Sequence, residues 1–123
     1  MILVDTSVWI DHLRATDTLL TERLIAGQVL VHPFVIGELA LGNLRQRLDV
    51  LDALQGMPYA EVASDAEVLH FIDQRQLAGL GIGYIDVHLL ASTQLLAGSS
   101  LWTRDKRLLA AASKLGLAFT SNS

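Results

Sequence analysis

Short apolar runs alternate with longer segments of helical periodicity along this chain, which predicts strands that take turns with helices. Runs short enough to form buried strands occupy residues 2–4, 28–32, 59–62, 100–103 and 117–120. Strands that alternate with helices are typical of an α/β fold with a mainly parallel sheet. Since no linker, internal repeat or low-complexity segment divides the chain, we expect one α/β domain over residues 1–123.

Helices are expected between these strands, and several have recognisable start residues. The predicted helices cover residues 6–14, 18–26, 34–41, 44–54, 64–77, 84–97 and 105–115. Asp17 or Thr18 can cap the second helix, while Ser64 and Glu67 have the spacing of a capping box. The 84–97 helix is apolar almost all round, so it should be the most buried one.

Four acidic residues stand out because their surroundings are apolar. Asp5 directly follows the first strand, and Asp105 comes shortly after the strand at 100–103. Glu38 has no polar side chain among its four neighbours on either side, and Asp86 is nearly as isolated. Burying an unpaired charge is costly, and open α/β sheets bind ligands beyond the carboxyl ends of their strands. These acids are therefore candidates for a functional site.

Each acid also has a purely structural interpretation. Asp5, Asp86 and Asp105 lie at or near predicted helix starts, where a carboxylate can accept backbone N–H bonds. Glu38 could be a glutamate that faces solvent. Taken together, however, four converging carboxylates would repel one another and raise their pKa values unless a cation lay among them. Hard divalent ions with oxygen ligands, Mg²⁺ or Mn²⁺, would remove this conflict.

Composition narrows the possibilities further. The absence of cysteine excludes disulfides, zinc–thiolate sites, iron–sulfur clusters and thiol nucleophiles. Net charge is −4, but thirteen acids less the four candidates leave nine, against nine Lys and Arg, so charge neither supports nor excludes a phosphate-bearing substrate.

With neither a signal peptide nor a membrane span recognisable, a cytoplasmic location is expected. The apolar fraction of 51% is high and indicates that a partner or second subunit covers some surface.

Hydroxyl and basic residues flank the two strand-end acids. The hydroxyls could cap helices, or could bond to a carboxylate or to a water at the site; they belong to Thr6, Ser7 and Thr103. The basic residues could contact phosphates or could be a solvated helix start; they are Arg104, Lys106 and Arg107.

Other polar and aromatic residues have simpler interpretations. The four histidines share no metal-ligand spacing and are expected in the core or on the surface; they are His12, His32, His70 and His88. Trp9 and Trp102 are expected in the core. Asp11 is expected to pair with Arg14, three residues along the same helix.

Four segments resemble, in order, the motifs of PIN-domain ribonucleases, and above all those of VapC toxins from toxin–antitoxin pairs. They are Leu3–Ser7, Val35–Leu39, Gly83–Ala91 and Trp102–Arg107. Each motif is weak alone, whereas the ordered set is specific and spans nearly the whole chain. The resemblance implies a PIN-like domain in which a five-stranded, mainly parallel sheet has helices on both faces.

The resemblance also implies a function and a site. It implies RNA phosphodiester cleavage that depends on one or two Mg²⁺ or Mn²⁺ ions, a homodimer, and a cognate antitoxin that blocks the site. The catalytic and metal-binding acids would be Asp5, Glu38, Asp86 and Asp105, with Thr6 or Ser7 and Thr103 as supporting hydroxyls. Many relatives carry another acid shortly after the last motif aspartate, whereas Lys106 follows here, so a second ion would bind weakly or only with substrate.

Three alternatives stay open at this point. A haloacid-dehalogenase-like phosphatase also places an aspartate after its first strand, but it needs another at position 7, which is Ser7. A receiver-like module needs paired acids there and an acceptor aspartate after the third strand. A PIN-like domain without activity would only bind partners, but all four acids are present.

Overall fold

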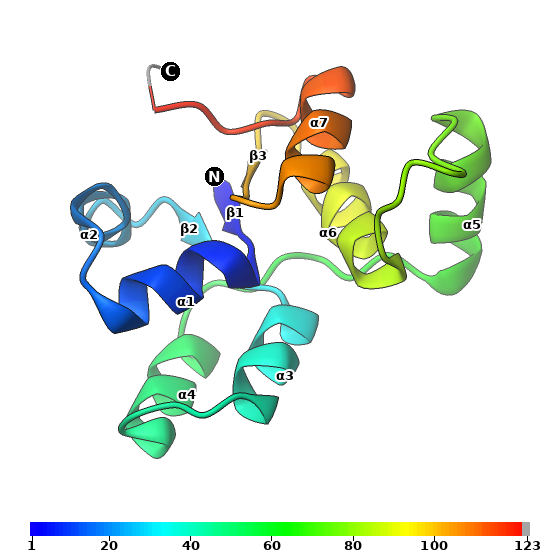
Figure 1. Ribbon diagram of the computed structural model, residues 1–123. Helices are drawn as coiled ribbons and strands as arrows, with labels where there is room; N and C mark the ends of the chain where they lie inside the picture. The colour runs from blue at the N-terminus through cyan, green and yellow to red at the C-terminus, as the bar shows by residue number, and fades with distance from the viewer. Residues whose placement is uncertain (122–123) are drawn as a thin grey trace.

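The computed structural model describes residues 1–121 and contains a three-stranded parallel sheet with seven helices in that range. The elements follow one another as β1 (Ile2–Val4), α1 (Thr6–Arg14), α2 (Thr18–Ile25), β2 (Val29–Leu30), α3 (Pro33–Leu41), α4 (Arg47–Gln55), α5 (Asp65–Gln74), α6 (Tyr84–Leu95), β3 (Ser100–Trp102) and α7 (Lys106–Lys114). The strands lie at the centre of the molecule with helices on both sides of them (Figure 1). The predicted α/β class and parallel sheet are confirmed.

The sheet is narrower than predicted. Its order is β2-β1-β3, and Ile2 pairs with Val29 on one side and Ser100 on the other. The prediction of five strands is wrong, because the segments at 59–62 and 117–120 make only isolated parallel bridges, Val31 with Tyr59 and Leu101 with Ala118.

Local chemistry explains why the outer pairings stop there. Beside Val31, the chain contributes only the carbonyl of Pro58 and the N–H of Ala60, and proline has no N–H with which to extend a ladder. At the other edge, Leu101 alone exchanges hydrogen bonds, with Leu117 and Phe119. Both outer segments are therefore too short to count as strands.

Each predicted helix is present, but α5 ends at Gln74 and not at residue 77, α6 ends at Leu95 and not at residue 97, and α4 starts later than predicted. Asp17 caps α2 through Leu20 N, and Ser64 forms the capping box of α5 with Glu67. Helix α4 begins at Arg47 and not at residue 44, because Gln46 has the left-handed backbone (φ 50°) that interrupts a helix.

The core is centred on β1 and α6. Residues 2–5 are buried, and every residue of α6 from Val87 to Thr93 is buried, as predicted for the most apolar helix. Trp9 and Trp102 are also in the core, as predicted. No helix within residues 1–121 is long and apolar enough to cross a membrane.

Two of the histidines are buried. His32 lies just before α3, where its Nδ1 accepts the N–H of Phe34 at 3.0 Å and its Nε2 lies 3.1 Å from Ser92 Oγ. His88 packs edge-on against Phe34 and Tyr84. These contacts agree with the prediction of core histidines.

Candidate active site

Asp5 lies at the carboxyl end of β1, where its N–H continues the ladder by bonding to Trp102 O at 2.9 Å. It occupies the N-cap position of α1, yet its side chain accepts no backbone N–H there. Its Oδ2 instead accepts hydrogen bonds from Ser7 Oγ at 2.7 Å and from Thr103 Oγ1 at 2.8 Å. Only 6% of Asp5 is exposed. The capping interpretation is therefore wrong for Asp5.

The two hydroxyls tie the start of α1 to the end of β3. Ser7 Oγ accepts the backbone N–H of Arg104 at 3.0 Å, and Thr103 Oγ1 accepts that of Asp105 at 3.1 Å. Because each hydroxyl donates its own proton to Asp5, both are oriented by bonds on two sides. This network holds the Asp5 carboxylate in one position.

Glu38 lies on α3, which packs against α1. Its side chain is exposed, as the solvent-facing interpretation expects, but its Oε1 accepts a 2.8 Å hydrogen bond from Thr6 Oγ1. Since Thr6 directly follows Asp5, this bond places Glu38 beside the carboxyl end of β1. The prediction that Thr6 supports a carboxylate agrees with this contact.

Asp86 lies in the first turn of α6, half-buried, with its Oδ2 accepting the N–H of Gly83 at 3.0 Å. Burial raises the pKa of this carboxyl above its ordinary value, and the charges of Asp5 and Asp105 raise it further, while the Gly83 bond acts against them. These electrostatic contributions mean that three of the four predicted acids lie near one another.

Asp105 is the N-cap of α7, and its Oδ1 accepts the N–H of Leu108 at 2.9 Å. The capping interpretation is therefore right for Asp105. Its charge nevertheless acts on Asp86, so the capping role does not remove it from the acidic group.

The acids do not form a ready-made coordination cluster. Within residues 1–121, no three His, Asp or Glu side chains lie in an arrangement that could hold a metal ion. The donor chemistry nevertheless fits a hard cation, because every donor is a carboxylate or hydroxyl oxygen. The Asp5 carboxylate has hydroxyl partners only, and the charges of Asp5 and Asp105 disfavour the ionised form of Asp86, a repulsion that a cation among them would relieve.

The three basic residues near α7 lie in different environments. Arg104 donates from Nη1 to Asp11 Oδ2 at 2.7 Å and from Nη2 to Asp17 Oδ2 at 2.5 Å. The prediction that Asp11 pairs with Arg14 is thus wrong, because Asp11 pairs across the fold with Arg104. Lys106 and Arg107 are exposed in the first turn of α7. No local pattern could have identified the Arg104 contacts, since both partners are more than eighty positions away.

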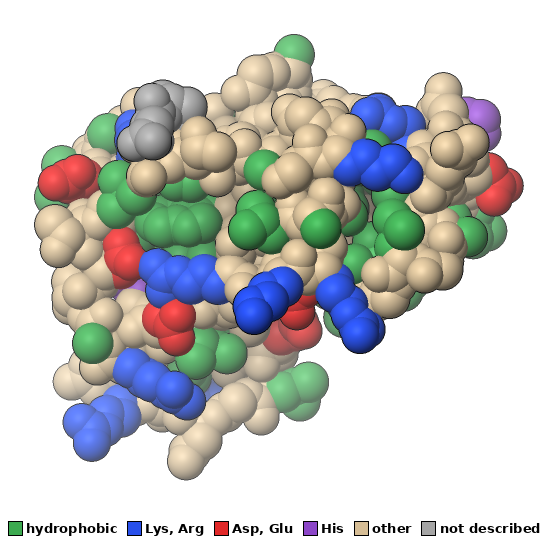
Figure 2. Space-filling view, turned by 45° about the horizontal axis from the view of Figure 1, so that its top comes forward, with side chains coloured by type: hydrophobic (Ala, Val, Ile, Leu, Met, Phe, Trp, Pro, Cys, Tyr) green, Lys and Arg blue, Asp and Glu red, His purple; other side chains and the backbone are tan. Residues whose placement is uncertain are grey.

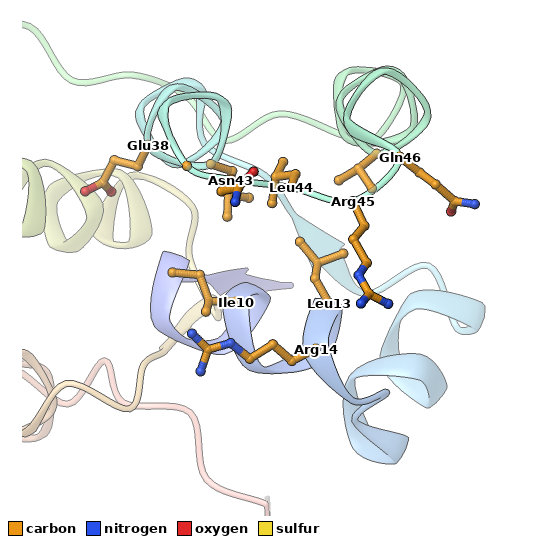
Figure 3. A pocket seen from close by; sticks show the side chains of 11 residues that line it. Ile10, Leu13, Arg14, Glu38, Asn43, Leu44, Arg45 and Gln46 are labelled. Atoms are coloured by element: carbon orange, nitrogen blue, oxygen red, sulfur yellow. The ribbon is translucent and has the colours of Figure 1, made fainter.

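A groove of about 840 Å³ lies beside Glu38, between α1 and the α3–α4 segment. Ile10 and Leu13 point from α1 toward Leu44 on the opposite wall (Figure 3). Arg14 and Arg45 line it as well, and neither forms an ion pair within residues 1–121. The groove thus combines apolar side chains with two arginines, Glu38 and the amides of Asn43 and Gln46, a feature that sequence periodicity did not reveal.

Comparison with known proteins agrees with this architecture. Ribonuclease VapC32 of Mycobacterium tuberculosis, in strains CDC 1551 and H37Rv, is 51% identical over 118 residues, which are 96% of this chain and 95% of the relative. The crystal structure of PAE2754 from Pyrobaculum aerophilum superimposes with a TM-score of 0.60 at 20% identity, covering 92% of this chain and 80% of that one. Residues 2–114 match the PIN domain, which confirms the resemblance seen in the four motifs. The chain belongs to the PIN domain family.

Proposed function

We propose that this protein is a VapC-type toxin that cleaves RNA phosphodiester bonds with Mg²⁺ or Mn²⁺ and is neutralised by a cognate antitoxin. The observation that carries the proposal is the buried Asp5 carboxylate, held by Ser7 and Thr103 and adjacent to further acids. The 51% identity to a protein named as a ribonuclease supports it. The phosphatase and receiver-like alternatives are not favoured, because the chain belongs to the PIN domain family.

The four acids would hold one or two ions, with Asp5 as the central ligand. A bound divalent ion supplies positive charge that stabilises the phosphate in the transition state and makes water easier to deprotonate. The Ser7 and Thr103 hydroxyls keep the Asp5 carboxylate oriented for this role. Glu38 would exchange its Thr6 bond for a ligand role, because its exposed side chain is free to turn.

The experiment compares RNA degradation by the parent, Asp5→Asn and Asp73→Asn in Mg²⁺, in Mn²⁺ and in EDTA. Asp73 is the matched control because it is an exposed acid in α5 whose carboxylate accepts no hydrogen bond within the described chain. We expect cleavage by the parent and Asp73→Asn, loss in EDTA, and a fall of more than about 100-fold in Asp5→Asn, since loss of a ligand should exceed loss of its supporting partner. Equal cleavage by Asp5→Asn and the parent would disprove the assignment.

The groove beside Glu38 is the surface that we propose for the antitoxin. Its apolar walls suit an amphipathic segment, while Arg14 and Arg45 would favour acidic side chains on that segment. A partner bound there would lie next to the site and could exclude RNA. Leu13→Asp should weaken co-purification with the cognate antitoxin, whereas Leu69→Asp, an exposed apolar position on α5, should not.

The proposed homodimer has a separate test. Several apolar side chains are strongly exposed, among them Leu41 at 91% and Ile25 at 83%, and surfaces of this kind are often covered by a partner. Sedimentation of the purified protein should give twice the mass of the chain, and a monomer at all concentrations would exclude the dimer.

A further inference from the structure

Arg107 differs from the other arginine at the start of α7. The guanidinium of Arg104 is engaged by the carboxylates of Asp11 and Asp17. The Arg107 side chain is exposed and has neither a hydrogen bond nor an ion pair within residues 1–121. Its donors are therefore available, whereas those of Arg104 are largely occupied.

Gly81 provides the surface against which Arg107 lies. Its backbone has φ +76°, a left-handed conformation that favours glycine. A Cβ at this position would lie 2.8 Å from Arg107 Nη1, 3.2 Å from Cδ and 3.3 Å from Cζ. The arginine side chain thus occupies the space that a side chain at position 81 would need.

This contact lies between two elements that carry candidate site acids. Gly81 belongs to the connection that leads into α6, five residues before Asp86, and Arg107 comes two residues after Asp105. The Asp86 and Asp105 carboxylates are close enough to influence each other. The contact therefore joins the segments that lead to Asp86 and Asp105, and Figure 2 shows basic side chains beside acidic ones on the face that it views.

RNA phosphates are repelled at such a site, because they are negatively charged and must approach a group of carboxylates. A divalent ion can serve the phosphate being cut, but neighbouring phosphates need other cations. Arginine suits this task, since its planar guanidinium can donate two parallel hydrogen bonds to one phosphate. Contacts of this kind position the nucleic acid without reading its sequence.

We propose that Arg107, whose guanidinium lies against Gly81, binds an RNA phosphate next to the one that is cleaved. This inference rests on the proposed ribonuclease function and adds a substrate-binding residue to it. Arg104 has a different role, because its two ion pairs join the end of β3 to the α1–α2 region.

The chain offers a matched pair of glycines for the test. Gly79 has φ +77° and open space where a Cβ would lie, with no atom within 4 Å, while Gly81 has φ +76° and lies against Arg107. Gly79→Ala and Gly81→Ala should therefore cause similar backbone strain, but only Gly81→Ala displaces the arginine. The displaced atoms are the end of a flexible side chain, so Gly81→Ala should still fold, as circular dichroism can verify.

Binding is measured in Mg²⁺ on the Asp5→Asn background, with a fluorescein-labelled single-stranded oligoribonucleotide of mixed sequence. Arg107→Gln and Gly81→Ala should each weaken binding by roughly 10-fold, a share of the free energy expected for one charge-assisted contact. The salt dependence of log K should fall by about 0.7 in Arg107→Gln. Gly79→Ala should bind almost as the background does, and adding Gly81→Ala to Arg107→Gln should cause no further loss.

The inference is overturned if Arg107→Gln binds like the background, if the two glycine variants bind alike, or if the background binds no RNA. Cleavage by the protein with an intact Asp5 is followed separately in Mg²⁺. Cleavage without an effect of Arg107 would reject only this inference. Binding through Arg107 without cleavage would instead reject the proposed function.

Discussion

Thr103 Oγ1 donates a 2.8 Å hydrogen bond to Asp5 Oδ2, although 98 positions separate the two residues in the chain. Both side chains are buried, at 5% and 6% exposure. The bond exists because β1 and β3 are parallel neighbours, with Val4 opposite Trp102, so the residues that follow them emerge at the same edge of the sheet. Thr103 therefore fixes the orientation of the carboxylate on which the proposed chemistry depends.

Thr103→Val keeps the shape of the side chain and removes its hydroxyl. We expect the rate of RNA cleavage to fall roughly 10- to 100-fold, as for other residues that orient a metal ligand. The free energy of unfolding should fall by about 1 kcal/mol, the usual contribution of one hydrogen bond. Thr103→Ser retains the donor and is the control. Parent-like cleavage by Thr103→Val would show that Ser7 alone orients Asp5.

The residues of the candidate site can be found from sequence because their neighbours in the chain are apolar, although only Asp5 of the four acids is buried and Glu38 is exposed. Asp5 and Glu38 stood out among apolar neighbours, and each accepts a hydrogen bond from a hydroxyl beside the same strand end. The sequence pattern could not distinguish an aspartate that caps its helix from one whose carboxylate is used elsewhere. Asp5 and Asp105 both lie between a strand and a helix, yet only Asp105 caps its helix, because the Asp5 carboxylate accepts its hydrogen bonds from Thr103 and Ser7 instead.

Features that depend on distant contacts could not be predicted. The prediction of strands at 59–62 and 117–120 was wrong because the length of a strand depends on the segment beside it. Pro58, for example, has no N–H that could bond to β2. Arg104 looked like a solvated or phosphate-binding residue because its partners, Asp11 and Asp17, are remote in sequence. The space that Gly81 leaves for Arg107 is likewise visible only in three dimensions.

Arg104 and Asp17 should stabilise the fold as a pair. Arg104→Gln should lower the free energy of unfolding by about 1 kcal/mol, since both partners are only partly exposed, at 37% and 21% of their side chains. Most of this loss should disappear on the Asp17→Asn background, as urea unfolding of the double-mutant cycle can establish. Additive effects of the two substitutions would mean that the ion pair contributes no stability.

The stability that the Arg104–Asp17 pair contributes should decrease in acid. A backbone bond from Leu20, followed by the contacts with Arg104, holds the pKa of Asp17 below its ordinary value of 3.8. A lowered pKa in the folded state means that the stabilisation is complete above 3.8 and is lost as the pH falls through the lower folded value. Between pH 7 and pH 5, the difference in stability between parent and Asp17→Asn should therefore stay constant, and it should shrink only below about pH 4.

His32 should make the stability of the fold depend on pH over a less acidic range than Asp17 does. Burial, and then the charge of His88, lower the pKa of His32 from 6.5 to about 4. Its Nδ1 accepts the N–H of Phe34, so the neutral ring has its proton on Nε2, toward Ser92, and a proton on Nδ1 would oppose that N–H. The unfolded chain takes up the proton more readily, so stability should decrease as the pH falls from 6.5 to about 4.

The size of the stability loss expected from His32 follows from the shift in its pKa. The total loss should be on the order of 3 kcal/mol, because one pKa unit corresponds to about 1.4 kcal/mol. Urea unfolding at several pH values checks it, with His32→Gln as the comparison because glutamine does not titrate. The slope of stability against pH between 4 and 6.5 should be smaller in His32→Gln. Identical slopes would show that other groups cause the acid sensitivity.

Asp86 should oppose folding when no divalent ion is present. Its pKa is raised first by burial and then by the charges of Asp5 and Asp105. A raised pKa means that the folded protein holds this proton more tightly than the unfolded chain does. Stability therefore decreases as the pH rises from the ordinary value of 3.8 through the raised one, and the cost persists at neutral pH.

Asp86→Asn should consequently raise the Tm of the protein in EDTA at pH 7, even though it should abolish cleavage. The asparagine carbonyl can still accept the Gly83 N–H, so the substitution removes charge and little else. Relief of about 1 kcal/mol would correspond to roughly 4 °C in a domain of this size. The gain should vanish near pH 3, where the aspartate is protonated in both states, and Asp73→Asn should show no gain at pH 7.

Added Mn²⁺ should raise the Tm of the parent and have less effect on Asp86→Asn, because the ion would relieve the same repulsion. A lower Tm for Asp86→Asn in EDTA would instead show that its charge stabilises the start of α6 more than its burial opposes folding.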